Sequence, residues 1–157
     1  MKILLAVDDT PYSLEAVKAL LARPWPIDTT VRVLSIIENM TPPATEIWYD
    51  AGTSLRLAEQ AQQEKIEKRT NLLADIAERL KVGKFVVETV IRQGDPRTEI
   101  VDEAKNWLAD LIMVGSHGYT GIKRWLLGSV AQSVVSHAPC SVEVVRLRHA
   151  DSLKAAG

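Results

Sequence analysis

The chain has 157 residues, of which 46% are hydrophobic and 25% are charged. This length suits one domain with a full hydrophobic core, and this composition excludes a mostly disordered chain, a collagen-like repeat and a disulfide scaffold. Nineteen basic and twenty acidic side chains give a formal net charge of −1, which predicts no strong non-specific attraction to nucleic acid or to an anionic membrane.

The first predicted element is a buried strand over residues 3–7, which form an unbroken apolar run. A helix follows, capped by Asp9 or Thr10, and Pro11 suits its first turn because no N–H is needed there. Pro24 ends this helix. Its expected buried stripe consists of apolar residues at helical spacing: Leu14, Val17 and Leu21.

The second predicted strand covers residues 30–37, which are rich in β-branched side chains. Residues 38–53 are expected to form an irregular loop, because the consecutive prolines at 42–43 fit neither a helix interior nor a central strand. This loop contains Trp48 and Tyr49, for which three roles stay open. The two aromatic side chains can pack over a site, form a dimer contact or cover the local core.

A long amphipathic helix is predicted from about residue 54 to residue 80, and a third strand over residues 85–91. The turn Gly94-Asp95-Pro96 starts another helix, with Asp95 as its cap. The expected buried stripe of that helix is apolar: Ile100, Val101, Ala104 and Leu108.

A short apolar strand is predicted over residues 111–114. A glycine-rich loop, a helix over residues 128–137 and a last strand over residues 142–147 follow it. Strands that alternate with helices pair in parallel through right-handed crossovers. The sequence therefore predicts an α/β fold: a single five-stranded, doubly wound, Rossmann-like and mostly parallel sheet with helices on both faces.

This domain is expected to cover residues 1–148, with a flexible tail over residues 149–157. Ligands of doubly wound sheets bind outside the carboxyl ends of the strands, where the connections change direction. We therefore expect the site just after strands one, two and four, near Asp8, Ile36 and Gly115.

The cellular compartment is indicated by the cysteine count and by the lack of targeting patterns. Cys140 is the only cysteine, so no intramolecular disulfide can form. The apolar start is broken by Asp8 and Asp9, which makes it too short for the core of a signal peptide. No apolar run approaches the roughly 18 residues that a membrane span needs. These features predict a cytoplasmic protein.

The segment from Gly115 to Ser129 leaves a buried strand, contains four glycines and enters a helix. Free amides at the helix start, near Gly128, Ser129 and Val130, favour phosphate oxygens together with the helix dipole. The hydroxyl of Ser129 can add a hydrogen bond. The alternative is that the glycines serve only as turn residues and a helix cap. Neither a Walker A loop nor a G-x-G-x-x-G motif after the first strand occurs.

The spacing Gly115-x2-Gly118-x9-Gly128-Ser129 resembles the ATP-binding signature of the universal stress protein family. Four other segments look like that family and fall in the right order: Ile3–Asp8, Gly94–Pro96, Asp110–Gly118 and Pro139–Val142. The resemblance runs from residue 2 to about residue 147, which is nearly the whole chain.

This resemblance implies that the chain binds ATP, alone or with Mg²⁺. It places Asp8 near the ribose and the phosphates, and it places a backbone group at Ile36 against the adenine edge. The phosphates would be surrounded by loop amides: Gly115, Gly118, Gly128, Ser129 and Val130. The resemblance also implies a homodimer, in which the strand over residues 142–147 pairs with its twin across a two-fold axis.

For some polar residues near this loop, two alternative roles are considered. Asp9 either caps the first helix, which is favoured, or adds charge near the phosphates through Mg²⁺. His117 lacks a triad partner at a suitable spacing, so a packing or hydrogen-bonding role is favoured over that of a general base. Lys123 and Arg124 either lend positive charge to the phosphates or form a solvated face of the loop.

Three functions are weighed. The favoured one is an ATP-binding regulatory or stress-response module. The second is an ATP-hydrolysing enzyme, for which only slow turnover is expected because no Walker lysine or evident base is present. The third is a phospho-accepting receiver domain, suggested by Asp8 and Asp9. It ranks lowest because its third strand would have to be followed by an aspartate, whereas Arg92, Gln93 and Gly94 stand there.

Overall fold

A computed structural model describes residues 1–38, 51–118 and 126–147, with the side chains of residues 51–55 left out. Trp48, Tyr49, Lys123, Arg124 and the expected tail lie outside the described residues. Within them, nine elements alternate in chain order: β1 (Lys2–Ala6), α1 (Pro11–Leu21), β2 (Thr30–Ile37), α2 (Ala51–Lys81), β3 (Val86–Gln93), α3 (Pro96–Trp107), β4 (Leu111–Gly115), α4 (Ser129–His137) and β5 (Ser141–Val145).

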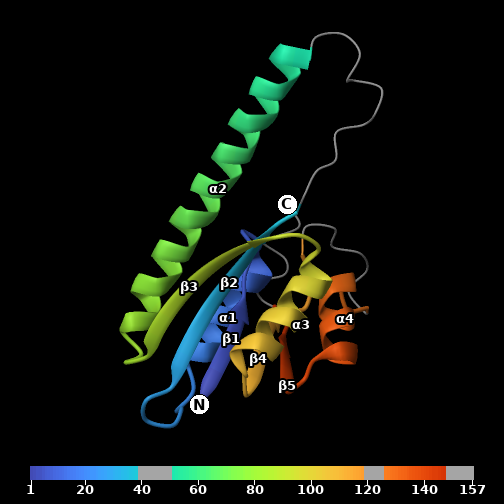
Figure 1. The fold of residues 1–157 in the computed structure, drawn as a ribbon. Helices are drawn as coiled ribbons and strands as arrows, with labels where there is room; N and C mark the ends of the chain where they lie inside the picture. Colours follow the sequence, from blue (N-terminus) through green and yellow to red (C-terminus); the bar gives the residue numbers. More distant parts are fainter. Residues whose placement is uncertain (39–50, 119–125, 148–157) are drawn as a thin grey trace.

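The sheet confirms the predicted fold class (Figure 1). Its five strands lie in the order β3-β2-β1-β4-β5, and all four neighbouring pairs are parallel. Helices α1 and α2 contribute to the core on one face of the sheet, and α3 and α4 contribute to the core on the other. The structure is therefore an open, doubly wound α/β sheet with both faces covered.

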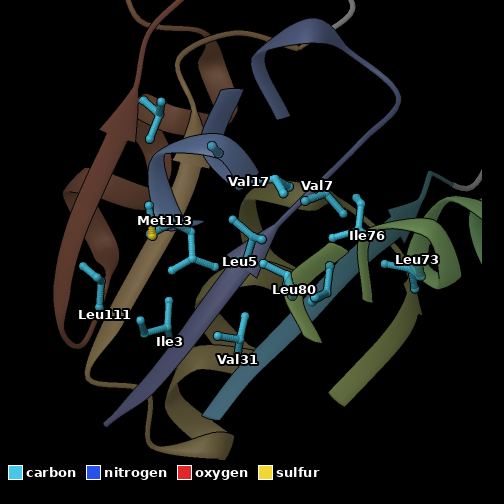
Figure 2. Packing of buried hydrophobic residues seen from close by; sticks show 14 residues of the cluster. Ile3, Leu5, Val7, Val17, Val31, Leu73, Ile76, Leu80, Leu111 and Met113 are labelled. Atoms are coloured by element: carbon cyan, nitrogen blue, oxygen red, sulfur yellow. The ribbon is translucent and has the colours of Figure 1, made fainter. Parts of the chain in front are cut away.

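The central strand β1 explains why the sequence begins with an unbroken apolar run. Ile3, Leu5 and Val7 point into the first core cluster, where they meet side chains of α1 and α2 (Figure 2). Leu4 and Ala6 point to the opposite face, into the second core cluster with α3 and α4. Since both faces of β1 are buried, neither set of alternating positions can be polar.

The buried faces of two helices differ from the predicted stripes. In α1, Leu14 and Leu21 are exposed, and the buried face is built mainly of smaller side chains, among them Ser13 and Ala16. In α3, Leu108 is not a stripe residue. It caps the helix at its C-terminus in the left-handed conformation, with φ 58°, and is 75% exposed. The predicted stripes were therefore wrong at Leu14, Leu21 and Leu108 and right at Val17, Ile100 and Ala104, which are buried. Spacing alone shows neither how closely a helix approaches its sheet nor where the helix ends.

The strand order also rules out the receiver-domain hypothesis. Receiver domains such as CheY have the flavodoxin-like order 2-1-3-4-5, in which the third strand lies next to the first. Here β3 is at the edge and β1 lies between β2 and β4. Within the described residues, no helix is long and apolar enough to cross a lipid bilayer.

A charged cluster joins α3 to the β2–β3 side of the sheet. The Glu103 carboxylate, only 4% exposed, accepts hydrogen bonds from Arg32 Nη1 at 2.7 Å and from Arg92 Nε and Nη2 at 2.9 and 2.7 Å. Arg32 also pairs with Glu88 and lies over the Trp107 ring, 4.3 Å from its centroid. Burial raises the pKa of Glu103, but the hydrogen bonds from Arg92 and Arg32 outweigh burial and hold that pKa below its ordinary value.

Replacing Glu103 should therefore destabilise the fold. We expect Glu103→Gln to lower the free energy of unfolding by about 3 kcal/mol, because two guanidinium groups would lose a shared carboxylate that is almost fully buried. Urea denaturation measures this change. Glu88→Gln is the matched control. Its side chain is 42% exposed, so it should cost less than about 1 kcal/mol. Equal losses of unfolding free energy in the two variants would contradict this stabilising role of the buried Glu103 carboxylate.

The same carboxylate should make stability depend on acid. A carboxyl whose pKa is depressed in the folded state contributes stability above its unfolded pKa, and that contribution is lost as the pH falls through the folded pKa. The ordinary pKa of Glu103 is 4.5, so its contribution should fade as the pH drops below about 5. Urea titrations from neutral to acidic pH should show a steeper loss in the wild type than in Glu103→Gln. Parallel profiles would contradict this prediction.

Candidate functional site

The sheet has one point where its connections change direction, and it lies between β1 and β4. These strands are neighbours, with Ala6 paired to Val114. The chain leaves β1 for α1 on one face and passes from β4 to α4 on the other. Open α/β sheets bind ligands outside the carboxyl ends of the strands at such a point. The candidate site is therefore the edge formed by the residues that follow β1 and β4.

Asp8 follows β1 and has a carboxylate with two distinct oxygens. Oδ1 accepts hydrogen bonds from the Thr10 N–H at 3.0 Å, the Thr10 hydroxyl at 2.5 Å and the Ser13 hydroxyl at 2.6 Å. The Asp8 N–H donates in turn to Ser13 Oγ at 2.9 Å. Sequence reasoning missed Thr10 and Ser13 as partners, although serine one turn into a helix lies within reach of the residue before that helix.

The second oxygen of Asp8 faces the glycine-rich loop. A Cβ atom placed on Gly118 would lie 3.4 Å from Asp8 Oδ2, and no other described atom outside its chain neighbours would lie within 4 Å of it. The structure thus brings these two predicted site residues together, although 110 positions separate them in the chain. Within the described part of the chain, the space beside Gly118 is therefore open apart from Asp8.

Gly128 joins the two described ends of the loop. Its N–H donates to the Ser116 carbonyl at 2.8 Å. A Cβ atom at Gly128 would lie 3.1 Å from His117 Cα and 3.2 Å from that carbonyl, which is tighter than most real contacts. A glycine here therefore serves the close approach of two backbone segments. A side chain at this position would disturb the loop itself, so a Gly128→Val variant would not test ligand binding independently of the fold.

The start of α4 presents backbone donors next to this junction. Gly128 is the N-cap, with φ −60° and ψ 153°, and has no side chain to cap the helix. The first amides of α4, at Ser129 and Val130, begin the helix directly after it. Ser129 is exposed, whereas Val130 packs its side chain against the second core cluster. The amides and the helix dipole together favour an anion.

Ile36 lies one strand further along the same edge. The pairing of β1 with β2 ends at Ala6 and Leu34, and β2 continues for three residues beyond it, to Ile37. Ile36 is half-buried, with its side chain against the second core cluster. Its backbone therefore belongs to the part of β2 that extends past β1, beside the turn that carries Asp8.

Gly115 has a structural role that the loop pattern did not reveal. A Cβ atom there would lie 2.8 Å from Tyr12 Cβ and 3.0 Å from the Tyr12 carbonyl carbon. The glycine thus lets the first turn of α1 approach the end of β4. Tyr12 also contacts His117, with ring centroids 5.1 Å apart. His117 Nδ1 lies 3.1 Å from Ser116 Oγ, and its buried Nε2 has no hydrogen-bond partner among the described residues, which agrees with a packing role.

Asp9 does not cap α1. The N-cap is Thr10, and the Asp9 carboxylate instead pairs with two cations of α2, Lys68 at 2.5 Å and Arg69 at 3.5 Å. The favoured cap interpretation was therefore wrong. Across the described ranges, no group of three histidine, cysteine, aspartate or glutamate side chains is placed to hold a metal ion.

Comparison with known proteins gives the same fold over the whole domain. The model of the Universal stress protein family matches residues 1–146. Universal stress protein MJ0531 of Methanocaldococcus jannaschii is 33% identical over 149 residues, covering 92% of this chain and 81% of that protein.

Two solved structures illustrate the likeness. The hypothetical protein MJ0577 aligns with a TM-score of 0.80 at 28% identity, over 94% of this chain and 96% of that one. A universal stress protein family protein from Arabidopsis thaliana, solved with AMP bound, aligns with a TM-score of 0.67 at 19% identity, over 96% and 94%. At that identity the second match supports the fold alone. With a family model that spans almost the entire chain, this protein belongs to the universal stress protein family.

Proposed function

We propose that the chain binds ATP at the edge between β1 and β4 and acts as a nucleotide-dependent regulatory or stress-response module, with at most slow ATP hydrolysis. The observation that carries this proposal is the position of Asp8 Oδ2 beside the open face of Gly118. Gly118, which that oxygen faces, and the start of α4 lie on the two described ends of one loop, which the hydrogen bond from the Gly128 N–H to the Ser116 carbonyl holds together.

The two kinds of group suit different parts of a nucleotide. The amides at Gly118, Ser129 and Val130 are the proposed donors for phosphate oxygens, whereas the Gly128 N–H already donates to the Ser116 carbonyl and holds the loop in shape. The Asp8 carboxylate can accept hydrogen bonds from ribose hydroxyls, which an amide N–H cannot do because it only donates. In this proposal the adenine lies toward the extended end of β2 near Ile36. The family membership, together with the spacing that resembles the family's ATP-binding signature, supports an adenine nucleotide as the ligand.

Mg²⁺ fits this arrangement as a companion of the phosphates. Mg²⁺ keeps several waters and is commonly held by one or two carboxylates together with substrate phosphates. Asp8 Oδ2 can supply one such oxygen, since Oδ1 is occupied by three donors. Asp9 is not proposed as a ligand because Lys68 and Arg69 already neutralise it.

The residues assigned here favour binding over rapid phosphoryl transfer. Enzymes that transfer phosphoryl groups place a lysine, an arginine or metal ions against the charge that develops on the phosphate. None of the seven assigned positions carries a lysine or arginine: Asp8, Ile36, Gly115, Gly118, Gly128, Ser129 and Val130. A bound nucleotide would therefore remain unhydrolysed on the protein, so that binding itself could act as the signal. The cytoplasmic location expected from the sequence stays a prediction.

Equilibrium titration with ATP, ADP and AMP tests the proposal. We expect saturable ATP binding that Asp8→Asn weakens by about tenfold or more, because a charge-assisted hydrogen bond is worth about 1.5–3 kcal/mol. The asparagine can keep an oxygen at Oδ1, so the change falls on the oxygen that faces Gly118. Asp28→Asn, at the opposite edge of the sheet, is the matched control and should bind as the wild type does. Gly118→Val should fold normally and lose affinity, since its methyl groups would fill the open space.

The outcomes separate cleanly. No binding by the wild type at millimolar ATP would refute the proposed function. Binding that neither Asp8→Asn nor Gly118→Val weakens would place the ligand elsewhere on the protein.

We also propose that two copies associate through β5. This strand is last in the sheet order, so its outer edge has no neighbouring strand among the described residues. An apolar edge strand left open is a template for pairing with another chain. Val142 and Val144 are half-buried in the single chain.

Light scattering after size-exclusion chromatography should therefore give about twice the chain mass of 17.4 kDa. The expectation follows from an isologous contact, which closes after two copies. A monomer at tens of micromolar protein would refute the dimer without bearing on nucleotide binding.

A further inference from the structure

Asp9 connects the candidate nucleotide edge to a distant part of the chain. It follows Asp8 directly, in the turn between β1 and α1, and its side chain is 21% exposed. Its Oδ2 lies 2.5 Å from Lys68 Nζ and its Oδ1 lies 3.5 Å from Arg69 Nη1. Burial raises the pKa of Asp9, but the two cations outweigh burial and hold that pKa below its ordinary value, so the carboxylate stays charged.

The ion pairs of Asp9 lie where the side chains of α2 change from mostly exposed to partly buried. C-terminal to them, Leu73, Ile76 and Leu80 are buried in the first core cluster. N-terminal to them, the side chains of residues 56–64 are exposed apart from Gln62, which is half-buried. Figure 1 shows this end of the helix extending away from the sheet. The Asp9 pairs thus hold α2 close to where it leaves the body of the protein.

We infer that Asp9, Lys68 and Arg69 form a charged joint through which α2 senses whether the nucleotide edge is occupied. Asp9 is a positioning residue in this scheme and does not touch the nucleotide. The inference rests on the proposed function, since it requires an anionic ligand beside Asp8.

The physical basis is the charge that a nucleotide adds. Phosphates near Gly118 and the start of α4 would place negative charge close to Asp8 and Asp9. Like charges brought together raise the benefit of nearby cations, and the effect is strong where water is partly excluded. Bound ATP should therefore add to the attraction that Asp9 already exerts on Lys68 and Arg69, which Asp9 holds beside the edge, and should stabilise the middle of α2. By linkage, loosening that hold must in turn change the affinity for ATP.

Amide hydrogen exchange across α2 tests the joint, with and without saturating ATP. In the absence of ATP, Asp9→Asn should speed exchange in residues 64–72 by about twofold to fivefold, the range expected for an ion pair with an exposed lysine. Residues 76–80 should exchange as in the wild type because Ile76 and Leu80 anchor this part of α2 in the first core cluster. With ATP, exchange in residues 64–72 should slow in the wild type and not in Asp9→Asn, although that variant still binds ATP.

Two variants separate the joint from a general effect on α2. Asp75→Asn removes an exposed ion pair on the same helix, in which Asp75 Oδ2 lies 2.9 Å from Arg79 Nη2. This pair does not involve Asp9, so the variant should keep the response to ATP. Asp9→Glu keeps the charge and should restore part of the response. A merely structural role for Asp9 would change exchange without ATP and leave the ATP-dependent difference intact.

Each remaining outcome decides between the proposals. If the wild type binds ATP but exchange in α2 does not respond, the joint is refuted and nucleotide binding stands. An equal response in the wild type and in Asp9→Asn would also refute it, because the signal would then travel by another route. If the wild type binds no ATP, the proposed function fails and the joint fails with it.

Discussion

The edge of the sheet between β1 and β4 depends on how the Asp8 carboxylate is held. One oxygen takes all three donors from the first turn of α1, and the Asp8 N–H returns a hydrogen bond to Ser13. The other oxygen is thereby aimed at Gly118. Because the protein has already fixed this orientation, a ligand that uses the free oxygen does not have to order the side chain on binding.

The end of the candidate site near Ile36 is stabilised by a charged cluster that includes a residue of α3. Arg92 lies opposite Ile36 in the register of β3 and β2, and Glu103 of α3 ties it to Arg32 further back along β2. The cluster therefore fixes the part of β2 that extends past β1, where the adenine is proposed to lie. Hydrogen bonds to charged groups thus set both ends of the edge, while the middle is built from glycine backbone.

The sequence predicted the strands better than the helix faces, for a physical reason. Residues 30–37 were found with their observed bounds because β-branched and other apolar side chains dominate this mostly buried strand. The buried face of a helix depends on how near it lies to the sheet. Tyr12 approaches Gly115 so closely that small side chains such as Ser13 fit beneath α1, and Leu14 turns outward. The spacing of apolar residues in the sequence does not indicate the distance between a helix and its sheet.

The features of the candidate site also differ in how well the sequence predicts them. Amides at a helix start and glycines in a loop acquire their geometry from their neighbours in the chain, so a spacing motif can indicate them. An ion pair between distant elements has no such local source. Asp9 meets Lys68 and Arg69 only after α2 has packed on the sheet through residues such as Ile76. The amides proposed to bind phosphate can therefore be predicted from the sequence, whereas the proposed control through charge on α2 can be inferred only from the tertiary structure.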